Sequence, residues 1–136
     1  MKIAAGDADA THSFSVNTAL LAPFLGAAYS NGILIHSAGL HMHNLGTRGR
    51  ISLDGSSGDR CLLAIDAWDF HWQGSYRFDK PVKLPIGDTV KLECHWDNSQ
   101  ANQAIYDGEQ LVARDVEWGE GTTDEMCLGV LYVSPP

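Results

Sequence analysis

Two histidines separated by a single residue, His41 and His43, are the first candidates for a functional site in this sequence. Side chains two residues apart in a β-strand point to the same face, which places these imidazoles roughly 6–7 Å apart along the chain while Met42 points the other way. Two imidazoles at that spacing can bind one metal ion. The alternative interpretation is a pair of partly exposed histidines at a strand end, where the chain runs into residues 44–46.

A methionine at the start of an apolar segment is a candidate third ligand. Residues 118–125 form a polar loop of glycines, threonines and acids, and Met126 opens the apolar run that follows. A methionine in such a place usually fills the core. If it instead faces the histidine pair, the site has two imidazoles and one thioether, which suits copper cycling between Cu(I) and Cu(II) and does not suit calcium or magnesium. Zinc accepts two histidines but rarely a thioether.

The acids of the same loop could play more than one part. Glu120, Asp124 and Glu125 could act as general bases, whereas in a solvated loop they need no catalytic role. Asp124 or Glu125 could also orient a ligating imidazole through a hydrogen bond.

The remaining four histidines are expected to lie outside this pair. His36 lies on the opposite face from His41 if the strand is regular, and a bulge at residues 37–39 would invert that. His12, His71 and His95 stand alone in the sequence, and we expect them to be hydrogen-bonded structural imidazoles.

Three cysteines allow at most one internal disulfide and leave one free thiol. Cys94 falls in the middle of an expected strand and Cys127 at the start of another, both near polar loops, so we expect these two to pair. Cys61 lies in an apolar run and is expected to be a small buried side chain. Thiolate ligation of a metal is the alternative, but no Cys-x-x-Cys spacing supports it.

An aromatic segment, residues 66–73, holds Trp68, Phe70 and Trp72. Such a cluster could stack nucleic-acid bases, but the acidic composition of the chain disfavours that. We expect core packing, with the indole N–H groups bonded to the backbone.

The elements that must position these side chains are mostly strands. The only helical candidate, residues 18–29, contains Pro23 and Gly26, which limit it to a turn or two. Residues 100–108 are expected to form a polar loop. Several short strands separated by turn residues predict an all-β fold, an antiparallel sandwich or barrel. The β-rich segments are residues 32–43, 50–53, 61–66, 75–78, 89–96, 113–118 and 126–133.

Length and charge restrict the possibilities further. A chain of 136 residues is expected to form one domain, residues 1–136, and it carries a formal net charge of −8. That charge argues against nucleic acid or an anionic membrane as a partner, and no apolar run is long enough to span a bilayer. Residues 1–7 contain no long apolar stretch, so no signal peptide is visible; we expect a cytosolic protein or a mature or excised form.

Several segments, in this order, resemble the C-terminal copper domain of the copper type II, ascorbate-dependent monooxygenases in its bacterial form; animal relatives are peptidylglycine α-hydroxylating monooxygenase and dopamine β-hydroxylase. The resemblance runs from about residue 3 to residue 133. The segments that carry it are HMHNLG (41–46), WDFHWQ (68–73), the Gly-Asp turn followed by a cysteine (87–94), DNSQAN (97–102) and WGEGTTDEMC (118–127).

The resemblance implies a jelly-roll sandwich of about eight or nine antiparallel strands. It implies copper held by His41, His43 and Met126, and a disulfide between Cys94 and Cys127. Dioxygen would bind at this copper and a nearby substrate C–H bond would be hydroxylated, with ascorbate as the electron donor. A disulfide and a copper site together indicate an oxidising, extracytoplasmic compartment.

This sequence also departs from the family pattern. The family enzymes carry a second, N-terminal copper domain that delivers an electron, and this chain has no room for one. In the peptide hydroxylase an arginine, an asparagine and a tyrosine grip the substrate carboxylate, at positions occupied here by Gly39, Leu128 and Val130. Peptidylglycine is therefore not the expected substrate. His71 replaces an asparagine common in the family, and we assign it no role.

Three functions remain open at this point. The leading hypothesis is the oxygen-activating domain of a copper monooxygenase, which takes dioxygen and a small-molecule substrate and works with a second copper domain or an external electron donor. The second is a stand-alone module that carries or buffers copper. The third is a sandwich that has lost its metal and binds proteins or sugars through its aromatic residues.

Overall fold

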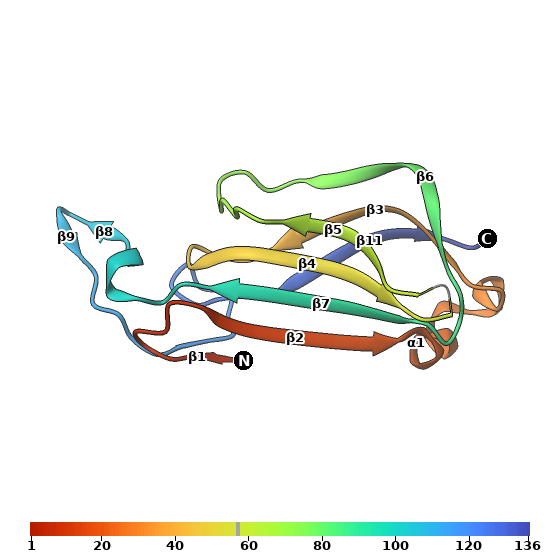
Figure 1. The fold of residues 1–136 in the computed structure, drawn as a ribbon, viewed down its shortest axis with the longest axis horizontal. Helices are drawn as coiled ribbons and strands as arrows, with labels where there is room; N and C mark the ends of the chain where they lie inside the picture. Colours follow the sequence, from red (N-terminus) through yellow and green to blue (C-terminus); the bar gives the residue numbers. More distant parts are fainter. Residues whose placement is uncertain (57) are drawn as a thin grey trace.

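The computed structural model describes residues 1–56 and 58–136, and their architecture is an antiparallel β-sandwich (Figure 1). One layer has four strands in the order β2-β7-β4-β5, and the other has three in the order β11-β3-β6. The first layer consists of β2 (Ala10–Asn17), β7 (Thr89–Trp96), β4 (Gly46–Asp54) and β5 (Arg60–Ile65). The second consists of β11 (Leu128–Ser134), β3 (Ile33–His41) and β6 (Ser75–Leu84).

Two small ladders and three short helical segments complete the secondary structure of the described residues. The ladders join β1 (Lys2–Ile3) to β10 (Val116–Glu117) and β8 (Ile105–Tyr106) to β9 (Glu109–Gln110). The helical segments are α1 (Thr18–Leu25), η1 (Ala27–Tyr29) and η2 (Gln100–Asn102). Eleven strands are present in residues 1–56 and 58–136, and the chain changes layer at almost every connection, so the expected all-β jelly-roll sandwich is confirmed.

The core lies between the two layers because alternate residues of each strand point inward. Ala38 and Leu40 of β3 pack with Ile51 of β4, and Leu92 and Leu131 close the cluster from β7 and β11. No helix among the described residues is long and apolar enough to cross a membrane.

A bulge in β3 changes the expected orientation of His36. The pairing of β3 with both neighbours shifts register between Ile35 and Ser37, which leaves His36 without a Cα partner. The His36 ring lies 5.6 Å from that of Tyr132 and its Nε2 is 2.9 Å from the Ser134 hydroxyl. Tyr132 extends from the face of the sheet that carries His41, so His36 lies on that face too. The prediction that His36 lies opposite His41 in a regular strand is therefore wrong. The alternative, a bulge that inverts the orientation, is correct, and the bulge lies at His36 itself.

One end of the sandwich gathers the segments of interest. There β3 and β7 end, β4 and β11 begin, and the β8–β9 hairpin projects beyond them (Figure 1). The expected disulfide is present: Cys94 of β7 is bonded to Cys127, the residue before β11, and so ties the two layers together at this end. Beneath it Met42 and Trp96 are fully buried in one cluster.

Some sequence expectations differ from the structure. The strand β2 lies in a segment with no clear alternation, and it forms because each of its residues pairs with β7. The expected strand at residues 113–118 shrinks to β10, and the expected loop at 100–108 contains η2 and β8. Cys61 was expected to be buried and is exposed, because it lies on the outer face of β5.

Candidate metal centre

The structure brings the two predicted imidazoles together at the end of β3. His41 is the last residue of the strand and His43 follows two positions later, and the ring centroids are 5.2 Å apart at an interplanar angle of 80°. Met42, between them, is fully buried on the opposite side, as the alternation predicts.

Each ring is held by a hydrogen bond through its Nδ1 atom. Nδ1 of His41 is 2.6 Å from Oε1 of Gln73, and Nδ1 of His43 is 2.9 Å from the backbone carbonyl oxygen of Asp124. The Gln73 amide is itself oriented because its Nε2 donates to the carbonyl of Phe70 at 2.6 Å. Both acceptors are carbonyl oxygens, so both rings donate from Nδ1 and carry their lone pairs on Nε2.

This arrangement is the one that metal-ligating histidines adopt, with one nitrogen anchored and the other free to coordinate. Within the described ranges, neither Nε2 of His41 nor Nε2 of His43 has a hydrogen-bond partner. Sequence reasoning missed Gln73, because an exposed glutamine 32 residues away gives no signal without the fold that brings it to His41.

A buried carboxylate fixes the backbone around His43. Glu125 is 1% exposed, and its two oxygens accept hydrogen bonds from the backbone N–H of His43 (2.8 Å), the backbone N–H of Leu45 (2.7 Å) and Nε1 of Trp96 (2.9 Å). Burial raises the pKa of Glu125, and these N–H donors oppose that rise. The solvated-loop interpretation is therefore wrong for Glu125. The alternative, that Asp124 or Glu125 orients an imidazole through a hydrogen bond, holds in a modified form. The backbone carbonyl of Asp124 holds the His43 ring, and the Glu125 side chain holds the turn that carries His43.

The aromatic segment encloses His43 from another side. Nε1 of Trp68 donates to the His43 carbonyl at 3.1 Å, and the Phe70 ring meets the His43 ring edge-on with centroids 5.9 Å apart. A Cβ at Gly46 would lie 2.8 Å from the Trp68 ring, so only glycine allows the indole to approach this turn. The expected packing is confirmed for Trp68 and is wrong for Trp72, which is 80% exposed.

Met126 lies at the same end of the sandwich, beside the histidine segment. It precedes Leu128 by two residues, and Leu128 pairs with His41 in the ladder between β11 and β3. The flanking residues are both fixed, Glu125 by its bonds to His43 and Leu45 and Cys127 by the disulfide, and Met126 is 9% exposed. Residues 1–56 and 58–136 contain no group of three or more His, Cys, Asp or Glu side chains suited to a metal ion.

Two of the three isolated histidines, His12 and His95, have hydrogen-bond partners for their rings, as expected. Nε2 of His12 is 2.9 Å from the Lys2 carbonyl, and Nδ1 of His95 is 2.8 Å from the Thr11 hydroxyl. The expectation is wrong for His71, whose ring is exposed to solvent with its Nδ1 3.5 Å from the Asp69 carboxylate.

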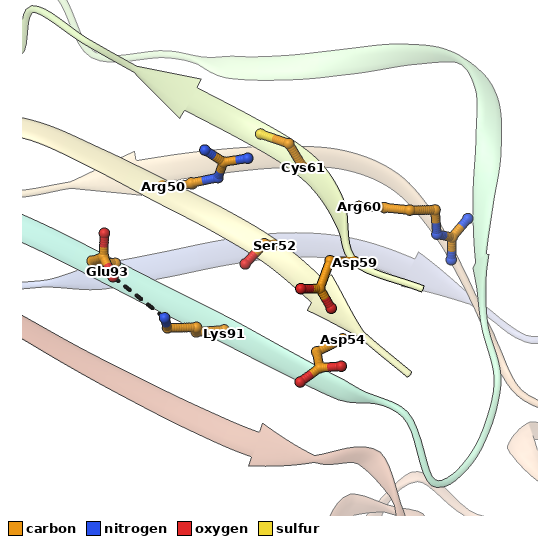
Figure 2. Close-up of a pocket in the computed structure, with 8 residues that line it drawn as sticks. All are labelled: Arg50, Ser52, Asp54, Asp59, Arg60, Cys61, Lys91 and Glu93. Atoms are coloured by element: carbon orange, nitrogen blue, oxygen red, sulfur yellow. Dashed lines mark ion pairs between the residues drawn. The ribbon is translucent and has the colours of Figure 1, made fainter. Parts of the chain in front are cut away.

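Away from the histidine pair, a hollow of about 360 Å³ lies on the outer face of the four-stranded layer (Figure 2). The cations and carboxylates that line it compensate one another, as in the ion pair of Lys91 with Glu93 at 3.4 Å. Two of the carboxyls also lie next to each other, and Asp59 raises the pKa of Asp54. It shares no residue with the histidine pair. The lining residues are Arg50, Ser52, Asp54, Asp59, Arg60, Cys61, Lys91 and Glu93.

The described part of the chain is an antiparallel β-sandwich that presents two imidazoles, each anchored through Nδ1, at one end. Residues 26–134 match the family model of the copper type II ascorbate-dependent monooxygenase C-terminal domain. The chain belongs to this family, whose members use copper and ascorbate. The matched range includes both histidines, Met126 and both disulfide cysteines. The disulfide in turn indicates an oxidising compartment.

Proposed function

We propose that the chain binds one copper ion through Nε2 of His41, Nε2 of His43 and the thioether of Met126, as the oxygen-activating site of a monooxygenase. The observation that carries the proposal is the pair of Nδ1 anchors, which leaves both Nε2 atoms available on adjacent rings. Two imidazoles and a soft thioether suit copper in both oxidation states and favour Cu(I), and three protein ligands leave a coordination position open. The residues present therefore fit the metal of the family.

Copper bound here would supply the redox chemistry for hydroxylation of a substrate C–H bond. In that reaction ascorbate, directly or through a second copper domain, would supply two electrons and solvent two protons, so that one atom of dioxygen would enter the substrate and the other would leave as water. The protein holds the ring of His41 through Gln73, the ring of His43 through the Asp124 carbonyl, and the intervening backbone through Glu125. In this account the family relationship, the disulfide and the metal together favour an extracytoplasmic location.

The substrate side of the site is apolar. Residues paired across an antiparallel ladder point to the same face, and Leu128 lies opposite His41 while Val130 lies opposite Gly39. Leu128 and Val130 are exposed and carry no charge. A substrate carboxylate would meet no cation at these positions, so the substrate group that lies here is uncharged.

Copper titration combined with oxygen consumption tests this function. We expect one tightly bound copper ion per chain and ascorbate-dependent oxygen consumption above that of free copper. His41→Ala should abolish both, whereas His71→Ala, which removes an exposed histidine outside the site, should change neither. Tight binding with no turnover above free copper, with a one-electron mediator added to replace a second copper domain, would instead identify a copper carrier, and failure to bind copper would refute both functions.

A further inference from the structure

A groove of about 670 Å³ lies at the same end of the sandwich, beside the segments that hold His43. One wall consists of Asn44, Leu45 and residues 122–125, and the other consists of the β8–β9 hairpin with the residues that flank it. Its volume is in the range of small-molecule sites. Neither proposed imidazole ligand lines it, so the groove is distinct from the proposed copper site.

The hairpin wall exposes four large apolar side chains within eight residues. Ile105 and Tyr106 are each 72% exposed, Leu111 is 43% exposed and Val112 is 80% exposed. All four line the groove, and ligand sites are lined mainly by apolar side chains. The hairpin projects from the body of the sandwich, so these side chains contribute nothing to the buried core (Figure 1).

Side-chain amides hold the hairpin in place. Gln100 donates to the Leu111 carbonyl at 2.8 Å and accepts from the Ala113 N–H at 2.9 Å. Gln110 donates to the Gln103 carbonyl at 3.2 Å. Two strands of two residues each are too short to be stable alone, so these bonds keep the hairpin folded while its apolar side chains stay exposed. The groove is therefore preorganised for a ligand.

The charged side chains that line this groove are one cation and two carboxylates. Arg114 is the cation among the lining residues, and its Nη2 donates to the Thr123 hydroxyl at 2.9 Å, which leaves other guanidinium N–H groups to bind an anion. Glu125 is buried and accepts from three N–H donors, and Asp124 accepts from the Gly121 N–H at 3.2 Å, so Arg114 is the lining group that can pair with an anionic ligand.

We propose that this groove binds a small amphipathic carboxylate. Its apolar body packs against Ile105, Leu111 and Val112, and its carboxylate pairs with the Arg114 guanidinium. Because Asn44 and residues 122–125 form the opposite wall, an occupied groove contacts the same segments that fix His43. The proposal concerns the protein alone and holds whether or not copper is bound.

Titration of the metal-free protein with octanoate, followed by amide chemical shifts, tests the site. We expect saturable binding of one octanoate per chain with a Kd on the order of 0.1–1 mM, with shifts at Asn44, Ile105 and Val112. Arg114→Gln should weaken octanoate at least tenfold and leave the weaker binding of neutral octanamide unchanged. Arg77→Gln, which removes an exposed cation of β6, is the matched control and should have no effect.

Three results would overturn the proposal. The first is the absence of saturable binding, and the second is equal octanoate affinity in the wild type and Arg114→Gln. The third is a concentration-dependent dimer that Val112→Asp dissociates, because a second copy would then occupy the groove. Both substitutions change exposed side chains, and the Arg114 carbonyl that accepts from Asn98 remains, so the variants should fold.

Discussion

Replacing Glu125 by glutamine removes one charge and one hydrogen-bond acceptor from the most buried polar contact of the site. The glutamine oxygen can keep the bonds from the His43 N–H and Trp96 Nε1, since both reach the same carboxylate oxygen. The amide nitrogen must then face the Leu45 N–H, which is 2.7 Å from the other oxygen in the wild type. Two donors would meet there with no acceptor between them.

The cost follows from these three bonds. An unsatisfied buried donor costs roughly 1–3 kcal/mol, and each of the two retained bonds weakens by about 1 kcal/mol when its acceptor becomes neutral. Relief of the unfavourable burial of the carboxylate, which raises the pKa of Glu125, offsets part of this. We expect the free energy of unfolding to fall by about 3 kcal/mol, which corresponds to a Tm lower by about 10 °C for a chain of this length.

Urea unfolding with the disulfide intact measures this change, and Glu120→Gln is the matched control. Glu120 is an exposed acid of the same loop, so its substitution should change the free energy of unfolding by less than about 0.5 kcal/mol. If Glu125→Gln is as stable as the wild type within that limit, the account of Glu125 as the residue that fixes the His43 turn is refuted.

Three further predictions concern the surroundings of the site. Gln73→Leu should weaken Cu(I) binding about 10–100-fold, measured by competition with a chelator, because the first imidazole loses its anchor; unchanged affinity would contradict the role of the amide. Replacing Cys94 and Cys127 together by alanine should lower the free energy of unfolding by roughly 4 kcal/mol, since the disulfide closes a loop across a sequence separation of 33 residues; a loss under about 1 kcal/mol in urea unfolding would argue against this. Hydrogen bonding to His95 lowers the pKa of Glu93, so this carboxylate stabilises the fold above its unfolded-state pKa and the contribution disappears as the pH falls through the lowered value. Unfolding experiments below about pH 4.5 should therefore show an acid-dependent loss of stability that is smaller in His95→Leu, and identical pH profiles would refute the link.

The sequence predicts well what depends on local pattern. Strand alternation placed His41 and His43 on one side and Met42 on the other, and the rings lie side by side as a result. The odd cysteine count and the surrounding polar loops led to the Cys94–Cys127 pair, which the structure contains. The all-β class followed from the spacing of short apolar segments.

What the sequence could not predict depends on contacts between distant segments. Gln73 reaches His41 across 32 residues, and Glu125 is buried because three N–H donors from two other segments surround it. The prediction that Cys61 and Trp72 are buried was wrong for the same reason. Each lies in an apolar or aromatic run of sequence, but the face that it occupies is set by the whole sheet or loop. The orientation of His36 required the position of a bulge, which alternation alone does not give.

X-ray absorption of the Cu(I)-loaded chain identifies the atoms that bind the copper. We expect two imidazole nitrogens and one sulfur neighbour around the copper, and we expect Met126→Ile to remove the sulfur signal. Met42→Ile should keep the sulfur signal, because Met42 lies between the two histidines in sequence but is buried in the core on the opposite side of the strand. A spectrum without sulfur in the wild type, or one that Met126→Ile leaves unchanged, would contradict the proposed two-histidine, one-methionine site.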